Sequence, residues 1–346
     1  MNLKVEEILK SATAKARLSI EVTKRCNSSC VYCFAGAGET NSAEIPLELF
    51  KEIILQGYNA AYRHLHITGG EPLLYRDIFE GLDYAIDLGY ESILLNTNGI
   101  LLNKQLCQRL ASYPGLTMTI SLEGTEALHD RYRGNGSYQK TIRGLENGLE
   151  AGIDIIIFTI ACKSLLPDLA SFADDLFSRF PGINYLTLIR LVSTAGDSSP
   201  LHKEFLAPGD FIELVHIVSL INLYGLRTVL MNEPLINVAC KMLGMSWVPK
   251  SKGLCHKGNL IVMADLSIYL FHTGRECCGN YESDSINRIL ASSRYKQATA
   301  PDKRVCPACK YAVLCSDGGL SRPTEWHMDK LMDSHYCKTV LDLIST

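Results

Sequence analysis

Apolar and polar positions follow two rhythms along this chain between Leu18 and about Leu223. Short, mostly apolar runs predict strands at residues 18–22, 64–68, 92–96, 117–122, 153–160 and 183–191. Stretches with helical periodicity lie between these runs and after the last one, at residues 46–63, 76–88, 104–112, 138–150, 166–180 and 208–224. Six strand–helix units with mainly apolar strands predict an α/β fold, in which helices cover a parallel sheet. The carboxyl ends of such strands are where α/β proteins place their sites.

The rhythm is lost from about Gly225 onwards, and the composition changes with it. This second region holds eight of the 13 cysteines: Cys240, Cys255, Cys277, Cys278, Cys306, Cys309, Cys315 and Cys337. A cysteine-dense region with few long periods is stabilised more by what it ligates than by its core. We therefore expect three parts: a lead-in at residues 1–17, a core at residues 18–224 and a cysteine-rich domain at residues 225–346.

Composition narrows the class of protein. The chain has 346 residues, 47% of them hydrophobic, which suits a globular protein with a large core. A formal net charge of −3 and the lack of a long basic run give no support for a nucleic-acid partner. The first seven residues read as a charged helix start and not as a signal peptide, and the longest apolar stretch, residues 153–162, is too short to span a membrane. We expect a cytoplasmic protein with no membrane partner, whose reduced thiols are available to bind metal.

Three closely spaced cysteines follow the first predicted strand. Cys26, Cys30 and Cys33 form a CxxxCxxC pattern, with Tyr32 and Phe34 on either side of the third cysteine. Three thiolates can hold one iron–sulfur cube and leave its fourth iron without a protein ligand. An open metal position distinguishes a reactive site from a structural one. The alternatives are a zinc knuckle or a chance cluster of cysteines.

This motif resembles the signature of the radical S-adenosylmethionine (radical SAM) enzymes. The resemblance implies a partial six-stranded (β/α)6 barrel, open on one side. It also implies that Cys26, Cys30 and Cys33 hold a catalytic 4Fe–4S cluster whose open iron binds the amino and carboxyl groups of SAM. Cleavage of SAM then produces a 5′-deoxyadenosyl radical that abstracts a hydrogen atom from the substrate. The cofactor supplies this chemistry, and the protein supplies position and exclusion.

The predicted strand at residues 64–68 ends in Gly69-Gly70-Glu71-Pro72. Two glycines let the backbone approach a ligand closely, and Glu71 offers a carboxylate at the strand tip. The resemblance makes this the segment that hydrogen-bonds the amino group of SAM. The alternative is an ordinary strand-to-helix turn.

Three further residues near strand ends are candidates for cofactor binding. Ser121 and Arg133 resemble the positions that hold the ribose and carboxylate of SAM, and an Arg fork suits a carboxylate. A surface ion pair is the alternative for Arg133. Asn98 belongs to a polar turn that closes the third predicted strand, where a SAM or substrate contact is a weaker possibility.

The cysteine-rich region resembles the SPASM extension of radical SAM enzymes, which carries auxiliary 4Fe–4S clusters. Cys306, Cys309, Cys315 and Cys337 form a complete ligand set. Cys255, Cys277 and Cys278 resemble the ligands of a second auxiliary cluster. This second set has no fourth cysteine, because full SPASM tails have a further cysteine shortly after the position of Cys315 and this chain has none there. Three outcomes are possible for this second set: a cluster held by three cysteines with an open iron, a cluster with His256 or His272 as a further ligand, or no cluster. A shortened "twitch" arrangement would join Cys255, Cys277 or Cys278, Cys306 and Cys309 on one cluster, and zinc is the main alternative for the whole region.

The reaction expected from this resemblance is that of an anaerobic, oxidoreductase-type radical SAM enzyme. Relatives with such a tail mostly oxidise, crosslink or mature peptides and proteins, so a peptide or protein is the first substrate class. A reductant such as flavodoxin or ferredoxin would supply the electron, and an auxiliary cluster would accept or relay one. The alternatives are a dehydrogenase or epimerase of an aminoglycoside sugar or cofactor precursor, and a non-catalytic iron–sulfur electron-transfer protein. Cys162 or Cys240 could donate a hydrogen atom in an epimerase, and Asp130, Glu233 and Asp317 are candidate bases.

Overall fold

The computed structural model describes residues 16–33, 35–38, 40, 42–191, 201–224, 228–251, 258–270, 277–298, 310–311, 314–315 and 334–346. Within these residues one sheet organises the fold, with the strand order β10-β9-β8-β1-β2-β3-β4-β5-β6-β7. The six strands expected from the sequence are β1 (Arg17–Glu21), β2 (His64–Thr68), β3 (Ser92–Thr97), β4 (Leu116–Ser121), β5 (Asp154–Ala161) and β6 (Ile183–Arg190). They pair in parallel and in sequence order, which confirms the expected α/β fold.

Four more strands come from the region where no sheet was expected. β7 (Thr228–Met231) extends the parallel sheet beside β6, and β8 (Leu260–Val262) pairs in parallel with β1 at the other side. β9 (Ser267–Tyr269) and β10 (Gly279–Asn280) continue that side as antiparallel strands. These strands have two to four residues, too few to show a period in the sequence. The second region therefore shares the sheet of the first, while the division at residue 224 stays a prediction.

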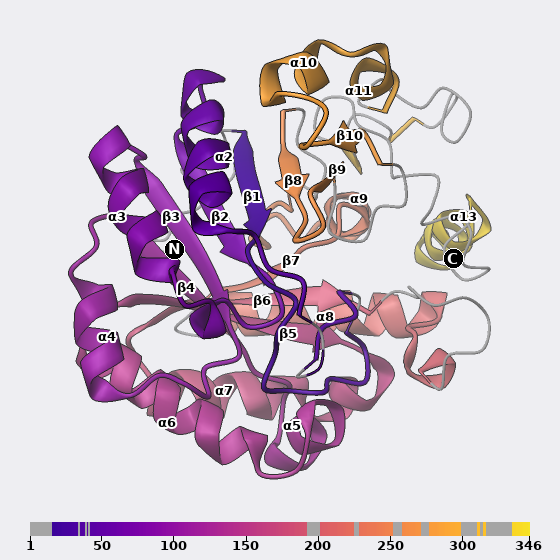
Figure 1. Ribbon diagram of the computed structural model, residues 1–346. Coiled ribbons are helices and arrows are strands. Elements are labelled where there is room, and N and C mark those ends of the chain that lie inside the picture. The colour runs from indigo at the N-terminus through magenta and orange to yellow at the C-terminus, as the bar shows by residue number, and fades with distance from the viewer. Residues whose placement is uncertain are drawn as a thin grey trace.

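Helices cover the convex side of the curved sheet (Figure 1). The expected helices are α2 (Leu47–Asn59), α3 (Ile78–Leu88), α4 (Lys104–Ala111), α6 (Ser137–Glu150), α7 (Leu169–Arg179) and α8 (Pro208–Tyr224). Further ones are η1 (Pro72–Leu74), α5 (Glu126–Arg133), η2 (Lys163–Asp168), η3 (His202–Glu204), α9 (Leu235–Met242), α10 (Ile286–Ala291), α11 (Ser293–Ala298) and α13 (Ser334–Ser345). Helix α5 escaped prediction because its eight residues are mostly charged or polar, and only Leu128 and Tyr132 mark its apolar side. Among the described helices, none is long and apolar enough to cross a membrane.

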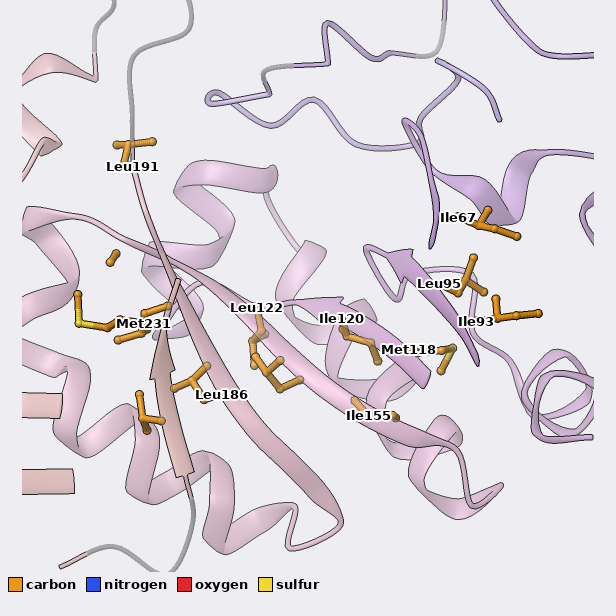
Figure 2. Packing of buried hydrophobic residues seen from close by; sticks show 14 of the residues in the cluster. Ile67, Ile93, Leu95, Met118, Ile120, Leu122, Ile155, Leu186, Leu191 and Met231 are labelled. Carbon is orange, nitrogen blue, oxygen red and sulfur yellow. The ribbon is translucent and has the colours of Figure 1, made fainter. Parts of the chain in front are cut away.

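Alternate residues of each strand face two different environments. Leu18, Ile20, Ile67 and Ile93 belong to the large core between the sheet and the helices, and Figure 2 shows the continuation of this core along β2 to β7. This layer follows from the burial of apolar side chains against amphipathic helices. Tyr185 and its neighbours form a separate, smaller apolar cluster on the other face.

That other face is largely polar near β1 to β4. Ser19 Oγ lies 3.0 Å from His66 Nδ1, and His64 Nδ1 lies 2.7 Å from Ser92 Oγ. Burial lowers the pKa of Arg17, and the hydroxyl of Tyr185 acts against this shift. Because β6 is five positions from β1 in the sheet order, this interaction requires the sheet to curve until its two sides face each other. The polar face therefore lines the inside of a partial barrel.

The second region packs against the β1 side of this barrel. The backbone N–H of Arg17 donates to Asn259 Oδ1 at 2.9 Å, and the N–H of Ala264 donates to Glu21 Oε1 at 3.2 Å. At the other side, α13 packs against α8 and α9, and Tyr336 donates its hydroxyl to the carbonyl of Leu206 at 3.0 Å.

Candidate active site

The three clustered cysteines lie on the loop that leaves the carboxyl end of β1. This loop is closed by backbone bonds from Cys26 to the carbonyl of Gly38 (3.3 Å) and from Ile45 to the carbonyl of Val22 (3.0 Å). The N–H of Cys33 bonds to the carbonyl of Cys30 at 3.1 Å, so the second and third cysteines share one turn. Phe34, one of the two aromatic residues of the motif, lies outside the described residues.

Two thiols of this loop, those of Cys26 and Cys30, are desolvated by burial. Cys26 is 7% exposed, while Cys30 and Cys33 are partly exposed, and none forms a disulfide. Burial raises the pKa of Cys26 to about 11, although the backbone N–H of Ser28 acts against this and the other two thiols reinforce it. Burial also raises the pKa of Cys30, against the nearby charge of Arg133. Such thiols ionise readily only when a cation binds them, as a metal centre would.

The three thiols of the loop suit an iron–sulfur cluster by their chemistry. Among the described side chains, no three His, Cys, Asp or Glu residues are arranged to hold one metal ion. In an iron–sulfur cube each thiolate binds its own iron, so the sulfurs lie farther apart than the ligands of one ion. Three undisulfided thiols on one loop, with the fourth corner left to another ligand, therefore fit the group that the motif implies.

The two glycines after β2 are required by the cysteine loop itself. The N–H of Gly70 donates to the carbonyl of Thr23 (2.7 Å), and the N–H of Glu71 donates to that of Arg25 (2.8 Å). A Cβ at Gly70 would lie 2.3 Å from the carbonyl oxygen of Arg25, and one at Gly69 would lie 2.5 Å from that of Thr23. The close neighbour of both glycines is thus the backbone of the cysteine loop, while a close approach of a ligand stays a prediction.

The carboxylate of Glu71 is fully buried and joins two strand tips. Oε1 accepts bonds from the N–H of Leu73 (3.1 Å) and from Thr97 Oγ1 (2.9 Å), and Oε2 accepts one from the N–H of Asn98 (2.8 Å). Burial raises its pKa to about 6, although these donors act against the shift. The side chain therefore holds β2 to β3. Pro72, at the start of η1, is also buried. The expectation that this segment binds the amino group of SAM stays a prediction, and its available acceptors are backbone carbonyls.

Asn98 directs its side chain toward the cysteine loop. Its Nδ2 donates to Asn27 Oδ1 at 2.7 Å and to Ser28 Oγ at 3.4 Å, and it lies 4.0 Å from Cys26 Sγ. Its carbonyl accepts a bond from Thr141 Oγ1 at 2.9 Å, which anchors the turn on α6. Asn98 therefore supports the loop that carries the thiols, and a contact with SAM stays a prediction.

Arg133 forms an ion pair, but the pair is buried, so the surface alternative is wrong. Its Nε donates to Glu123 Oε1 at 2.9 Å, and the two side chains are 11% and 2% exposed. The hydroxyl of Tyr32 donates to the same oxygen, and the N–H of Ile160 donates to Glu123 Oε2 at 2.7 Å. Ser121, the last residue of β4, is partly exposed two positions before this carboxylate.

His129 completes this group as a neutral acceptor. Its Nδ1 accepts a bond from the backbone N–H of Glu123 at 3.1 Å, and the side chain is fully buried. Burial, together with the nearby charge of Arg133, lowers its pKa to about 3. The ring is therefore uncharged at neutral pH and carries its proton on Nε2.

The proposed ligands of the second region are only partly described. Cys255, Cys306 and Cys309 lie outside the described residues. Cys277 is partly exposed and donates to the carbonyl of Gly279 at 2.9 Å, while Cys278 is 4% exposed within the core. Cys315 and Cys337, the latter on α13, are partly exposed. The auxiliary ligand sets stay predictions.

Several other candidates have structural partners. Cys162 is fully buried at the end of β5, 3.5 Å from the hydroxyl of Tyr132. Asp130 accepts bonds from the N–H groups of Gly136 (2.6 Å) and Tyr138 (2.8 Å), and Glu233 lies 2.9 Å from Arg190. Asp317 is outside the described residues. The sequence analysis did not propose a role for Glu123. Its only local signal is that a carboxylate follows directly after the predicted strand at residues 117–122.

Comparison with known proteins agrees with this arrangement. Residues 20–163 match the family model of the radical SAM superfamily. These residues belong to that superfamily. The radical SAM segment includes the cysteine loop, the Gly69–Pro72 turn, Ser121 and Arg133.

Relatives and solved structures extend the likeness. Mycofactocin maturase MftC of Mycolicibacterium smegmatis is 29% identical over 219 residues, which cover 60% of this chain and 55% of that protein. A probable GTP 3′,8-cyclase of Archaeoglobus fulgidus is 36% identical over 140 residues, covering 39% and 45%. The chain thus spans about half the length of the curated relatives it matches.

The fold is similar to that of two solved proteins. A structure described as native anSMEcpe with bound AdoMet, another name for SAM, superposes with a TM-score of 0.70 at 17% identity, covering 96% of this chain and 99% of that one. Streptococcus suis SuiB bound to S-adenosylmethionine gives a TM-score of 0.69 at 15% identity, covering 90% and 75%. At these identities the likeness establishes the fold, a radical SAM partial barrel with a further region after it.

Proposed function

We propose that this protein is a radical SAM enzyme that removes a hydrogen atom from a peptide or protein substrate. The observation that carries the proposal is the convergence of the cysteine loop with the tips of β2, β3 and β4. Thr23 and Arg25 of the loop bond to Gly70 and Glu71, and Tyr32 of the same loop bonds to Glu123. A radical SAM segment that brings these motifs together has the parts needed to hold SAM beside a cluster.

The roles of the residues follow from their positions. Cys26, Cys30 and Cys33 would hold a 4Fe–4S cluster, which, when bound, supplies the electron that cleaves SAM to methionine and a 5′-deoxyadenosyl radical. Gly69 and Gly70 present backbone carbonyls that suit the SAM amino group, and Arg133 presents a guanidinium that suits its carboxylate. Ser121 offers a hydroxyl to the ribose.

A polar group of the substrate suits the inside of the barrel. Ser19, Glu21, His66 and Thr68 are polar, nearly buried and located on the two strands next to the cysteine loop. Each places its hydrogen-bonding group where an ordinary barrel has Val, Ile or Leu. Ser19 already pairs with His66, and Glu21 accepts the N–H of Ala264. Their hydroxyl, imidazole and carboxylate groups can form further hydrogen bonds, so this wall suits a substrate with polar groups of its own.

Relatives support a peptide as the first substrate class. MftC is named a maturase, SuiB has a structure bound to the precursor peptide SuiA, and anSMEcpe has one with the Cp18Cys peptide. The second candidate is a polar small molecule, because the same polar wall suits one and the probable GTP 3′,8-cyclase is among the relatives. A cytoplasmic setting, a flavodoxin or ferredoxin reductant and at least one auxiliary 4Fe–4S cluster belong to the proposal in either case.

The first experiment is anaerobic reconstitution with iron and sulfide, followed by SAM and dithionite. Wild type should form 5′-deoxyadenosine, and a Cys26/Cys30/Cys33 triple-Ala variant should form none. Cys107→Ala is the matched control, because it removes a fully buried thiol on α4 without touching the loop. Zinc in place of iron, or a cluster whose electron paramagnetic resonance (EPR) spectrum ignores SAM, would refute the proposal. Mass spectrometry of co-expressed candidate peptides, searching for the loss of two hydrogens, then tests the substrate class.

A further inference from the structure

Glu123 connects three parts of the site through one buried carboxylate. Its Oε1 accepts bonds from the hydroxyl of Tyr32 and from Arg133 Nε, and its Oε2 accepts the backbone N–H of Ile160. Its own N–H donates to the neutral ring of His129. The cysteine loop, the tip of β5 and helix α5 therefore meet at this residue.

The energetics of this group make its geometry rigid. The ion pair of Glu123 with Arg133 is almost completely buried, so removing either partner leaves a charge without compensation. Three donors hold the two oxygens of the carboxylate, and losing this acceptor would leave each buried donor unsatisfied at a cost in free energy. Arg133 therefore keeps one orientation relative to the strand tip.

That orientation leaves the end of the guanidinium available. Arg133 donates its Nε–H to Glu123. The two terminal nitrogens of Arg133 donate to no acceptor within the part of the chain that the structure describes. The guanidinium carbon lies 5.4 Å from the ring centroid of Tyr32, so the aromatic ring lies beside the same group. A fixed fork with its outer edge open is the arrangement that binds a carboxylate best.

Tyr32 links this fork to the metal site. It lies in the turn between Cys30 and Cys33, and the N–H of Val31 in that turn donates to the carbonyl of Tyr132 at 2.9 Å. The turn is thus held on α5 by a backbone bond and on Glu123 by the Tyr32 hydroxyl. Any movement of Glu123 would shift the cysteine turn and Arg133 together.

We propose that Glu123 is a positioning residue for SAM, which orients the fork of Arg133 toward the SAM carboxylate and holds the Cys30–Cys33 turn at a constant distance from it. This inference rests on the proposed function. Glu123 itself need not touch SAM, because it acts through Arg133 and Tyr32.

The chain provides a matched control on the same helix. Arg131, two residues before Arg133, pairs with Glu204, which is also nearly buried and accepts bonds from the N–H (3.1 Å) and hydroxyl (2.9 Å) of Ser164. Glu204→Gln therefore makes the same chemical change at a buried carboxylate, in a pair whose Arg side chain is 49% exposed. It should destabilise the protein without changing the affinity for SAM.

The experiment compares wild type, Glu123→Gln, Arg133→Gln, the double variant and Glu204→Gln after anaerobic reconstitution. Iron and sulfide are counted, and SAM is titrated into the dithionite-reduced protein while its EPR signal is recorded. We expect Glu123→Gln to keep its cluster and to raise the Kd for SAM about tenfold, or about 1.4 kcal/mol. The double variant should bind SAM as Arg133→Gln does, within about twofold, because Glu123 acts only through that Arg.

Each outcome decides the matter. A normal Kd in Glu123→Gln, or losses of the two single variants that simply add, would overturn the positioning role. If Glu123→Gln does not fold, Tyr32→Phe replaces it, since it removes a single hydroxyl bond; a Kd equal to that of wild type would then overturn the role. A wild-type protein that binds no SAM would overturn the proposed function itself. If wild type binds SAM and Glu123→Gln binds it equally well, only the positioning role is overturned.

Discussion

Replacing Gly70 by Ala tests the packing on which the whole site depends. The added Cβ would lie 2.3 Å from the carbonyl oxygen of Arg25 and 2.8 Å from that of Lys24, and both are backbone atoms. A contact this short cannot be relieved by turning a side chain. The strand tip and the cysteine loop must therefore move apart.

The cost can be worked from the bonds that this movement breaks. The bonds from Gly70 to Thr23 (2.7 Å) and from Glu71 to Arg25 (2.8 Å) both cross the same contact. Each hydrogen bond contributes about 0.5–1.5 kcal/mol net, and overpacking adds about 1–3 kcal/mol. Since part of the strain is relieved once the bonds break, we expect Gly70→Ala to lower the free energy of unfolding by about 2–4 kcal/mol.

The assay is urea unfolding of the cluster-free protein, together with iron and sulfide counts after reconstitution. Gly38→Ala is the matched control, because Gly38 lies in the same loop and a Cβ there meets no atom within 4 Å. It should change stability by less than about 1 kcal/mol. Gly70→Ala should also bind less iron, because Cys26 lies directly after the displaced Arg25. The reasoning is refuted if Gly70→Ala has the same free energy of unfolding as Gly38→Ala and binds as much iron as wild type.

Three further predictions concern buried polar groups. Burial raises the pKa of Glu71 from 4.5 to about 6. The protonated side chain therefore stabilises the folded protein fully below about pH 4.5, and this stabilisation is lost as the pH rises through 6. The total loss in the free energy of unfolding is about 2 kcal/mol. Relative to Glu71→Gln, cluster-free wild type should show this decline in urea unfolding between pH 4 and 7, and parallel pH profiles would contradict it. Asn98→Ala removes a donor near Cys26 Sγ, so the midpoint potential of the reconstituted cluster should fall in an EPR-monitored redox titration; an unchanged or higher potential would count against this role. Cys162→Ala should lower stability by about 1–2 kcal/mol through its buried cavity but leave the rate of 5′-deoxyadenosine formation unchanged, whereas a lost rate would give this thiol a role in the chemistry.

The local order of the chain was readable from its sequence. The apolar runs of β1 to β6 and the amphipathic stretches between them have clear periods, because one face of each element is buried against the next layer. The CxxxCxxC loop was visible for a related reason: thiols proposed to share one cluster must lie close together, and a short loop brings them together without help from the fold. The strand-end positions of Gly69 and Ser121 followed from the same alternation, whereas Arg133 is the last residue of α5, a helix that the sequence pattern did not predict.

Contacts between distant segments were decided only by the tertiary structure. β7 and β8 are too short to show a period, so their places at the two sides of the parallel strands depend on what they pair with. The need for Gly70 became clear only when the carbonyl of Arg25 lay against it. Glu123 and Tyr32 are 91 positions apart, and no local pattern connects them. A hydrogen bond depends on distance in space, and in a curved parallel sheet the strand tips that meet in space are far apart along the chain.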